Sequence, residues 1–140
     1  MLRKVPPSPE KARKGIEKAK VLLKQAKKDL EIENYDSCVM TGYAAMFNAA
    51  RAILLRDGVR ERSHYCAARY LERYVQKGGL EQKWIDLLDR VRDLRHSDQY
   101  DVSFFATRGD AGQALNISND FIGRMEKLLK APIRFGQERF

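Results

Sequence analysis

Residues 35–57, YDSCVMTGYAAMFNAARAILLRD, form the stretch that decides the fold of this chain. Apolar side chains recur along it every three or four residues, which is the spacing of a helix that buries one face. The residues predicted to face inward are Val39, Met40, Tyr43, Met46, Phe47, Ala50, Ile53 and Leu54. Gly42 and the neighbouring alanines keep this helix narrow, so that another helix or another subunit can pack closely. Asn34 is suited to cap its start and Gly58 to end it.

Four more helices are predicted around this one. Ser8 can cap a helix that starts at Pro9. Asn34 can end this helix by adopting a left-handed backbone conformation. Further helices are expected from His64 to about Gln76, from about Glu81 to Tyr100, and after the capping box Thr107-x-x-Asp110. No stretch is a convincing strand. Long helices joined by short connections pack side by side. We therefore predict an all-α fold, an up-and-down antiparallel bundle of about five helices over residues 9–130, with a flexible N-terminal tail (1–8) and a C-terminal tail (131–140).

The composition is that of one ordinary domain: 140 residues, 44% hydrophobic and 33% charged. The longest uninterrupted apolar stretches are only a few residues, well below the roughly 20 that a membrane-spanning helix needs. The N-terminus has no apolar core of a secretory signal. Cys38 and Cys66 fit neither a metal-ligand spacing nor a disulfide framework. We expect no membrane association and a reducing, cytoplasmic location.

The positive charge is concentrated near the N-terminus. Residues 1–28 hold ten of the 27 Lys and Arg residues but only two of the 19 Asp and Glu residues, and the remainder has no net charge. Lys20, Lys24 and Lys28 lie opposite the apolar stripe of the first helix. This surface is a candidate for binding a polyanion such as RNA, and a solvated helix face is the equal alternative.

Most signatures of catalysis are absent from the sequence. There is no glycine-rich phosphate loop, no G-x-S-x-G nucleophile motif and no H-E-x-x-H zinc motif. The two histidines, His64 and His96, are too far apart in sequence to indicate a local metal site. We expect no metal and no cofactor.

One polar segment interrupts the apolar pattern of the fourth helix, RVRDLRHSDQYD at residues 90–101. Arg95 and Asp98 fall on its apolar face, where charged groups are unfavourable unless they are paired. One interpretation is a buried ion pair between them. The other is that Arg95 faces a cleft and holds phosphate, with Arg92 and His96 enlarging the site. His64, at the start of the third helix, is a further candidate for binding.

Several motifs together resemble the HEPN domains (higher eukaryote and prokaryote nucleotide-binding), in particular stand-alone prokaryotic ones. These motifs are Asn34-Tyr35, GYAAMFNAARA at 42–52, Arg62-Ser63-His64, LRHSDQYD at 94–101 and NDFI at 119–122. The resemblance covers about residues 10–130. It implies a helical bundle that forms a homodimer. It also implies a minimal nucleotidyltransferase as partner, in a toxin–antitoxin-like pair.

Active members of that family are metal-independent ribonucleases with a motif of Arg, a polar residue, three variable residues and His. Arg95 and His96 match its first two positions, but Tyr100 stands where the histidine is expected. A phenol seldom exchanges protons near pH 7. We therefore expect a homodimeric module that binds RNA or a nucleotide in a cleft lined by Arg95, His96, Asp98 and Tyr100. The alternatives are a ribonuclease toxin that uses Arg95 with His96 or Tyr100, and a non-catalytic interaction scaffold.

Overall fold

The computed structural model describes residues 2–131 and confirms the all-α prediction. Its helices are α1 (Pro9–Glu31), α2 (Tyr35–Asp57), α3 (His64–Gln76), α4 (Gln82–Tyr100) and α5 (Arg108–Lys130). Two three-residue strands, β1 (Leu2–Lys4) and β2 (Val59–Glu61), complete the described fold. Of the predicted C-terminal tail at residues 131–140, residues 132–140 lie outside the described residues.

Local capping explains where α1, α2, α3 and α5 begin. The Ser8 side chain accepts a hydrogen bond from the Lys11 amide at 3.1 Å, and Thr107 forms a complete capping box with Asp110. The end of α1 differs from the prediction. The left-handed residue is Glu33 (φ 62°) and not Asn34, whereas the Asn34 side chain caps α2 as predicted. Because Asn34 is occupied as an N-cap, the reversal of the chain falls one residue earlier.

The N-terminal segment is ordered by a sheet that the sequence did not predict. β1 pairs antiparallel with β2, with Leu2 opposite Glu61 and Lys4 opposite Val59. The chain then stays close to the end of α2, where the Val5 amide donates to the Gly58 carbonyl at 3.0 Å. The expectation of no strand was therefore wrong for residues 2–4 and 59–61. Pairing between segments more than fifty residues apart leaves no local pattern.

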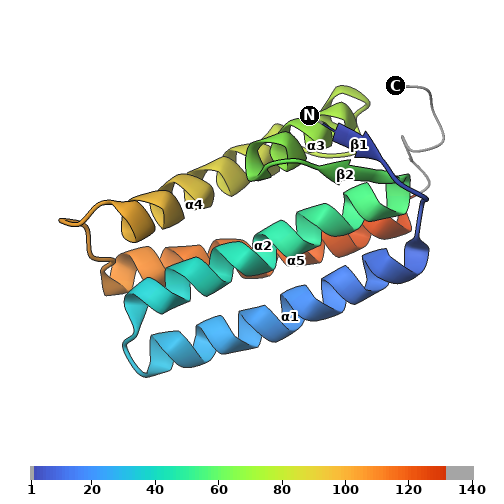
Figure 1. Ribbon diagram of the computed structural model, residues 1–140. Coiled ribbons are helices and arrows are strands. Elements are labelled where there is room, and N and C mark those ends of the chain that lie inside the picture. The colour runs from blue at the N-terminus through green and yellow to red at the C-terminus, as the bar shows by residue number, and fades with distance from the viewer. Residues whose placement is uncertain (1, 132–140) are drawn as a thin grey trace.

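Helix α2 is the centre of the bundle. Figure 1 shows α1 on one side of it, α3 and α4 on the other, and α5 behind it, in contact with both α1 and α2. A Cβ added to Gly42 would lie 3.1 Å from the Ser118 hydroxyl of α5, so the missing side chain lets α5 approach closely. The narrow face of α2 thus receives a helix of the same chain.

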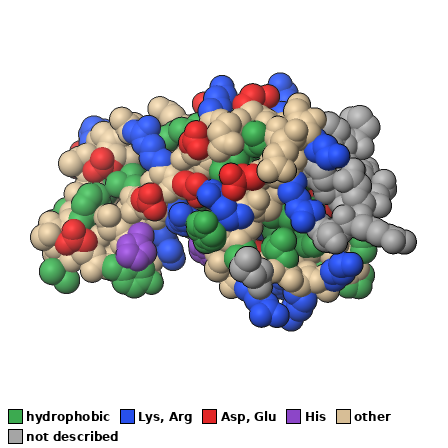
Figure 2. Space-filling view, turned by 90° about the horizontal axis from the view of Figure 1, so that it is seen from above, with side chains coloured by type: hydrophobic (Ala, Val, Ile, Leu, Met, Phe, Trp, Pro, Cys, Tyr) green, Lys and Arg blue, Asp and Glu red, His purple; other side chains and the backbone are tan. Residues whose placement is uncertain are grey.

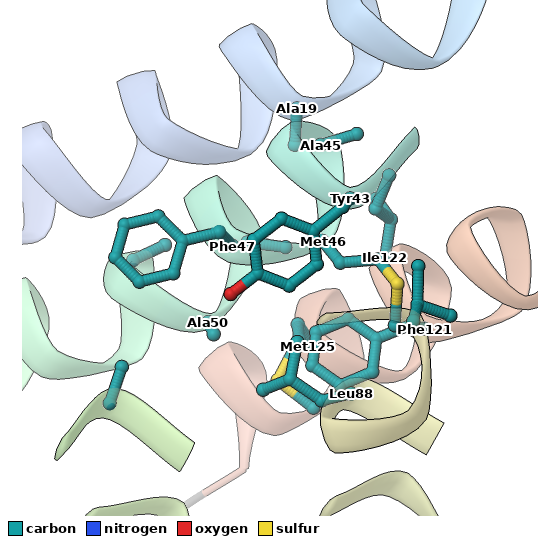
Figure 3. Packing of buried hydrophobic residues seen from close by; sticks show 14 of the residues in the cluster. Ala19, Tyr43, Ala45, Met46, Phe47, Ala50, Leu88, Phe121, Ile122 and Met125 are labelled. Atoms are coloured by element: carbon teal, nitrogen blue, oxygen red, sulfur yellow. The ribbon is translucent and has the colours of Figure 1, made fainter. Parts of the chain in front are cut away.

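The core is built on α2 with contributions from α4 and α5. Met46 of α2 lies near Phe121 and Met125 of α5 and Leu88 of α4, and Phe47 lies beyond Tyr43 (Figure 3). The predicted inward face of α2 is confirmed with one exception. Met40 is 36% exposed, because it lies at the edge of the face that the other helices cover.

A buried polar network ties α2 to α3 and α5. Arg56 donates to Asp57 Oδ1 at 3.0 Å, to the Leu128 carbonyl at 3.0 Å and to Tyr74 Oη at 2.5 Å. Tyr70 donates to Asp57 Oδ2 at 2.8 Å. Burial and the charge of Asp57 raise the pKa of Tyr70 above its ordinary value, so its proton stays in this bond. The sequence analysis had not identified these residues.

Length and apolar character alone would allow α2 to cross a membrane, which the sequence analysis had not expected of any segment. In the bundle, 67% of the most apolar 18-residue stretch of α2 is buried inside the protein. That degree of cover is typical of the core helix of a small soluble-type domain.

Candidate functional site

A groove of about 720 Å³ lies between the first turn of α3 and the second half of α4. Its lining residues are Ser63, His64, Tyr65, Arg92, Asp93, Arg95 and His96. Figure 2 shows basic and histidine side chains gathered at a hollow in the edge of the face that carries α3 and α4. Four residues predicted from the sequence, Arg92, Arg95, His96 and His64, are therefore brought together from two helices. This groove is named the α3–α4 groove below.

Arg95 is half-buried beside the aromatic core. Its Cζ lies 5.6 Å from the centre of the Tyr43 ring, in the range of a cation–π contact. Among residues 2–131 it forms no salt bridge, so the structure does not show the ion pair with Asp98 that was one of the two interpretations of the sequence. Its positive charge is therefore not neutralised by a carboxylate and is available to an anion in the groove.

Arg92 is held differently from Arg95. Its Nη2 lies 3.5 Å from Asp89 and 4.0 Å from Asp93, and its Cζ lies 5.5 Å from the centre of the Tyr65 ring. Its Nη1 is buried and makes no hydrogen bond within the described part of the chain. A buried guanidinium donor without an acceptor is uncommon and is a natural contact for a bound oxygen.

His64 is fixed in the groove by aromatic neighbours. Its Nδ1 is 3.0 Å from Tyr43 Oη, and its ring stacks on Phe47 at 3.9 Å between centres. Burial, followed by the positive charges of Arg95 and Arg51, lowers the pKa of His64 below its ordinary value. The imidazole is therefore neutral at pH 7.

Asp98 lies against Asp36 of α2 and does not line the α3–α4 groove. Both Asp98 carboxylate oxygens are buried, beside the Asp36 carboxyl group and the Ala106 amide. Burial, and then the hydrogen bond and charge of Asp36, raise the pKa of Asp98 to about 7. The bond with Asp98 and one from the Ala106 amide lower the pKa of Asp36. The two carboxyl groups thus share a proton, as expected for adjacent acids.

His96 and Tyr100, which stand at the second and last positions of the ribonuclease-like motif, are on the surface. His96 reaches the rim of the groove, whereas Tyr100 does not line it and is 61% exposed. Their ring centres are 4.7 Å apart. Tyr100 is therefore held near His96, outside the concave part of the site.

The predicted basic surface of α1 is separate from the groove. Lys20, Lys24 and Lys28 are exposed on α1, which lies across α2 from α3 and α4 (Figure 1). Lys20 Nζ is 2.8 Å from Glu126 of α5. One ligand in the groove cannot use both surfaces unless it extends around the bundle.

Sequence reasoning had not singled out Tyr65 and Tyr43 as groove residues. Tyr65 lines the groove and is 55% exposed, and Tyr43 contacts both His64 and Arg95 from below. The position of Tyr65 directly after His64, with Arg69 one turn later, was the available signal. Within residues 2–131, no cluster of three or more His, Cys, Asp or Glu side chains could hold a metal ion.

Two comparisons with known proteins bear on the identity of the chain. The model of the HEPN domain family matches residues 12–128, which is nearly the whole bundle. The chain is also 34% identical over 87 residues to a UPF0332 protein of Archaeoglobus fulgidus, which covers 62% of this chain and 70% of that relative. The motifs at residues 42–52 and 94–101 lie within the family match. By this match and its five-helix bundle, the chain belongs to the HEPN domain family.

Proposed function

We propose that this HEPN domain is a nucleotide- or RNA-binding module whose α3–α4 groove holds phosphate groups. The observation that carries the proposal is Arg95, a half-buried arginine without a carboxylate partner among the described residues, in the same groove as the buried Nη1 donor of Arg92. Planar guanidinium groups bind phosphate through two parallel hydrogen bonds. Family membership supports the same class of ligand.

In this proposal His64 binds the phosphate and does not act as a general base. Burial raises the pKa of Tyr43 to about 12, so the phenol keeps its proton at neutral pH. Because the described chain offers that proton only one acceptor, His64 Nδ1, we assign Tyr43 as the donor in this bond. The neutral imidazole then carries its own proton on Nε2. An Nε2–H group donates to a phosphate oxygen, whereas a general base needs a free lone pair.

The proposal includes a second copy of the chain. Three apolar side chains lie exposed where α4 passes into α5: Tyr100 is 61% exposed, Val102 96% and Phe105 74%. Exposed apolar residues gathered in one place are typical of interfaces. A partner there would cover the surface next to His96 and bring two α3–α4 grooves close together. Sedimentation of the protein used for binding gives its oligomeric state directly.

The test is the affinity for a fluorescein-labelled octauridylate RNA, measured by fluorescence anisotropy at fixed salt. We expect Arg95→Gln to weaken binding about 10- to 100-fold, because a hydrogen bond to a charged group contributes about 1.5–3 kcal/mol. Arg90→Gln is the matched control. It removes the same charge from an exposed position on α4, where Arg90 contacts Gln113 outside the groove.

If Arg95→Gln and Arg90→Gln lose the same amount of RNA affinity, the change in net charge alone explains the loss. That result would contradict the proposal. A second arm replaces Lys20, Lys24 and Lys28 by glutamate. Loss of affinity there, with Arg95→Gln unchanged, would move the binding surface to α1. The wild type should leave the RNA intact in the presence of EDTA, and metal-independent cleavage would instead favour the ribonuclease alternative.

A further inference from the structure

We infer that Tyr65 is a stacking platform for a nucleobase, so that the α3–α4 groove recognises single-stranded RNA through a base as well as a phosphate. This inference rests on the proposed function and adds to it the part of the ligand that is not phosphate. Tyr65 belongs to α3 and Arg95 to α4, so the groove has an aromatic ring on one helix and, on the other, a guanidinium without a carboxylate partner among residues 2–131.

Tyr65 is the aromatic residue of the groove whose ring a ligand can reach. Tyr43 and Phe47, which hold His64, are only 2% and 5% exposed, and their surfaces are already used in packing. Tyr65 is 55% exposed although it lines the groove. Bases of single-stranded RNA stack on exposed aromatic rings of this kind, because every base has a π-face.

The neighbours of Tyr65 keep its ring in place. The Cζ atoms of Arg69 and Arg92 lie 4.9 Å and 5.5 Å from the ring centre. The Asp89 carboxylate forms salt bridges with both arginines. One oxygen lies 2.5 Å from Arg69 Nη2, and the other lies 3.5 Å from Arg92 Nη2. The ring therefore packs against guanidinium groups that are themselves anchored. A platform ordered before binding loses little side-chain entropy when a base stacks on it.

The size of the groove fits a nucleotide unit. A volume of about 720 Å³ lies within the range of small-molecule sites, roughly 300–1,000 Å³. Arg95 and Arg92 offer donors to the phosphate, and Tyr65 offers an apolar face to the base.

The experiment compares two strands of equal length and charge, octaadenylate RNA and an eight-unit abasic ribose phosphate. For the wild type we expect octaadenylate to bind on the order of tenfold more tightly, as stacking of one base contributes about that much. In Tyr65→Leu the affinity for octaadenylate should fall to that of the abasic strand, while the abasic strand itself binds as before. Tyr65→Phe keeps the ring and should retain the preference.

Tyr35→Leu is the control variant. Tyr35 also has a guanidinium over its ring, with Arg108 Cζ at 5.5 Å, but it is outside the groove, so its replacement should leave the preference unchanged. Equal wild-type affinity for the two strands, or a preference that survives in Tyr65→Leu, would overturn the inference and leave phosphate binding intact. Failure of the wild type to bind either strand would overturn the proposed function as well.

Discussion

Replacing Asp98 by asparagine should stabilise the bundle, and by a larger amount at pH 8 than at pH 5. In the folded protein Asp98 faces Asp36 of α2, and both of its carboxylate oxygens are buried. Asp110 of α5 adds negative charge nearby. A protonated Asp98 can donate to Asp36, whereas an ionised Asp98 repels it. The amide of asparagine supplies the donor at every pH.

The sign follows from the pKa of Asp98, which is raised to about 7 in the folded protein from its ordinary 3.8. Below pH 4 both states hold the proton. Between pH 4 and 7 the unfolded chain releases the proton while the folded protein retains it, so the free energy of unfolding falls as pH rises. Above about pH 7 the fall levels off. The lowered pKa of Asp36 acts only below pH 4.

The size of the effect can be worked out from the same shift. One pKa unit corresponds to about 1.4 kcal/mol, and about two units of the shift lie between pH 5 and 7. Asp98 is only partly buried as a residue, so solvent screening reduces the difference to on the order of 2 kcal/mol between pH 5 and 8. The lowered pKa of His64 adds its own pH dependence to stability, but equally in wild type and variant, so it cancels in the comparison.

Urea unfolding followed by circular dichroism at 222 nm, at pH 5 and pH 8, measures this difference. Asp86→Asn is the control, because Asp86 is an exposed aspartate of the same helix that faces away from Asp36 and contacts Gln82. It should change stability equally at both pH values. If Asp98→Asn also changes the free energy of unfolding equally at both, the two carboxyl groups do not share a proton and the reasoning fails.

Three further predictions concern the fold. Arg56→Met should lower the free energy of unfolding by about 3–5 kcal/mol in thermal or urea denaturation, because it leaves Asp57 as a buried charge without its guanidinium partner; a loss below 1 kcal/mol would contradict this. Gly58→Ala should destabilise by more than about 1 kcal/mol, since Gly58 has φ 82° and the new methyl group would lie 2.8 Å from Pro7 Cγ. Gly123→Ala, with no atom within 4 Å of the new methyl group, should instead stabilise by about 0.5–1 kcal/mol in the same assay.

The helices were predictable because each of them is encoded locally. The bounds of α2, Tyr35–Asp57, follow from its apolar spacing and from the residues at its two ends. The starts of α1 and α5 follow from Ser8 and Thr107, whose side chains cap amides only three residues away. A pattern that acts within one turn of helix is visible in the sequence.

The candidate site was predictable as a set of residues but not as an arrangement. Arg92, Arg95 and His96 share one stretch of α4, so sequence spacing could group them. That His64 joins them, and that Tyr65 lies beside them, depends on how α3 crosses α4. Helical spacing also placed Asp98 near Arg95, but it gave no information about which residue of another helix each one meets.

The sequence by itself thus determined the all-α class, the helix positions and the motifs that mark a HEPN domain, because these depend on contacts within a few residues. Only the tertiary structure decided the rest. It paired Asp98 with Asp36 and not with Arg95, added β1 to β2, and left Arg95 without a carboxylate partner in the α3–α4 groove. Each of these depends on side chains or strands from segments far apart in the chain, whose meeting is set by the packing of whole helices against α2.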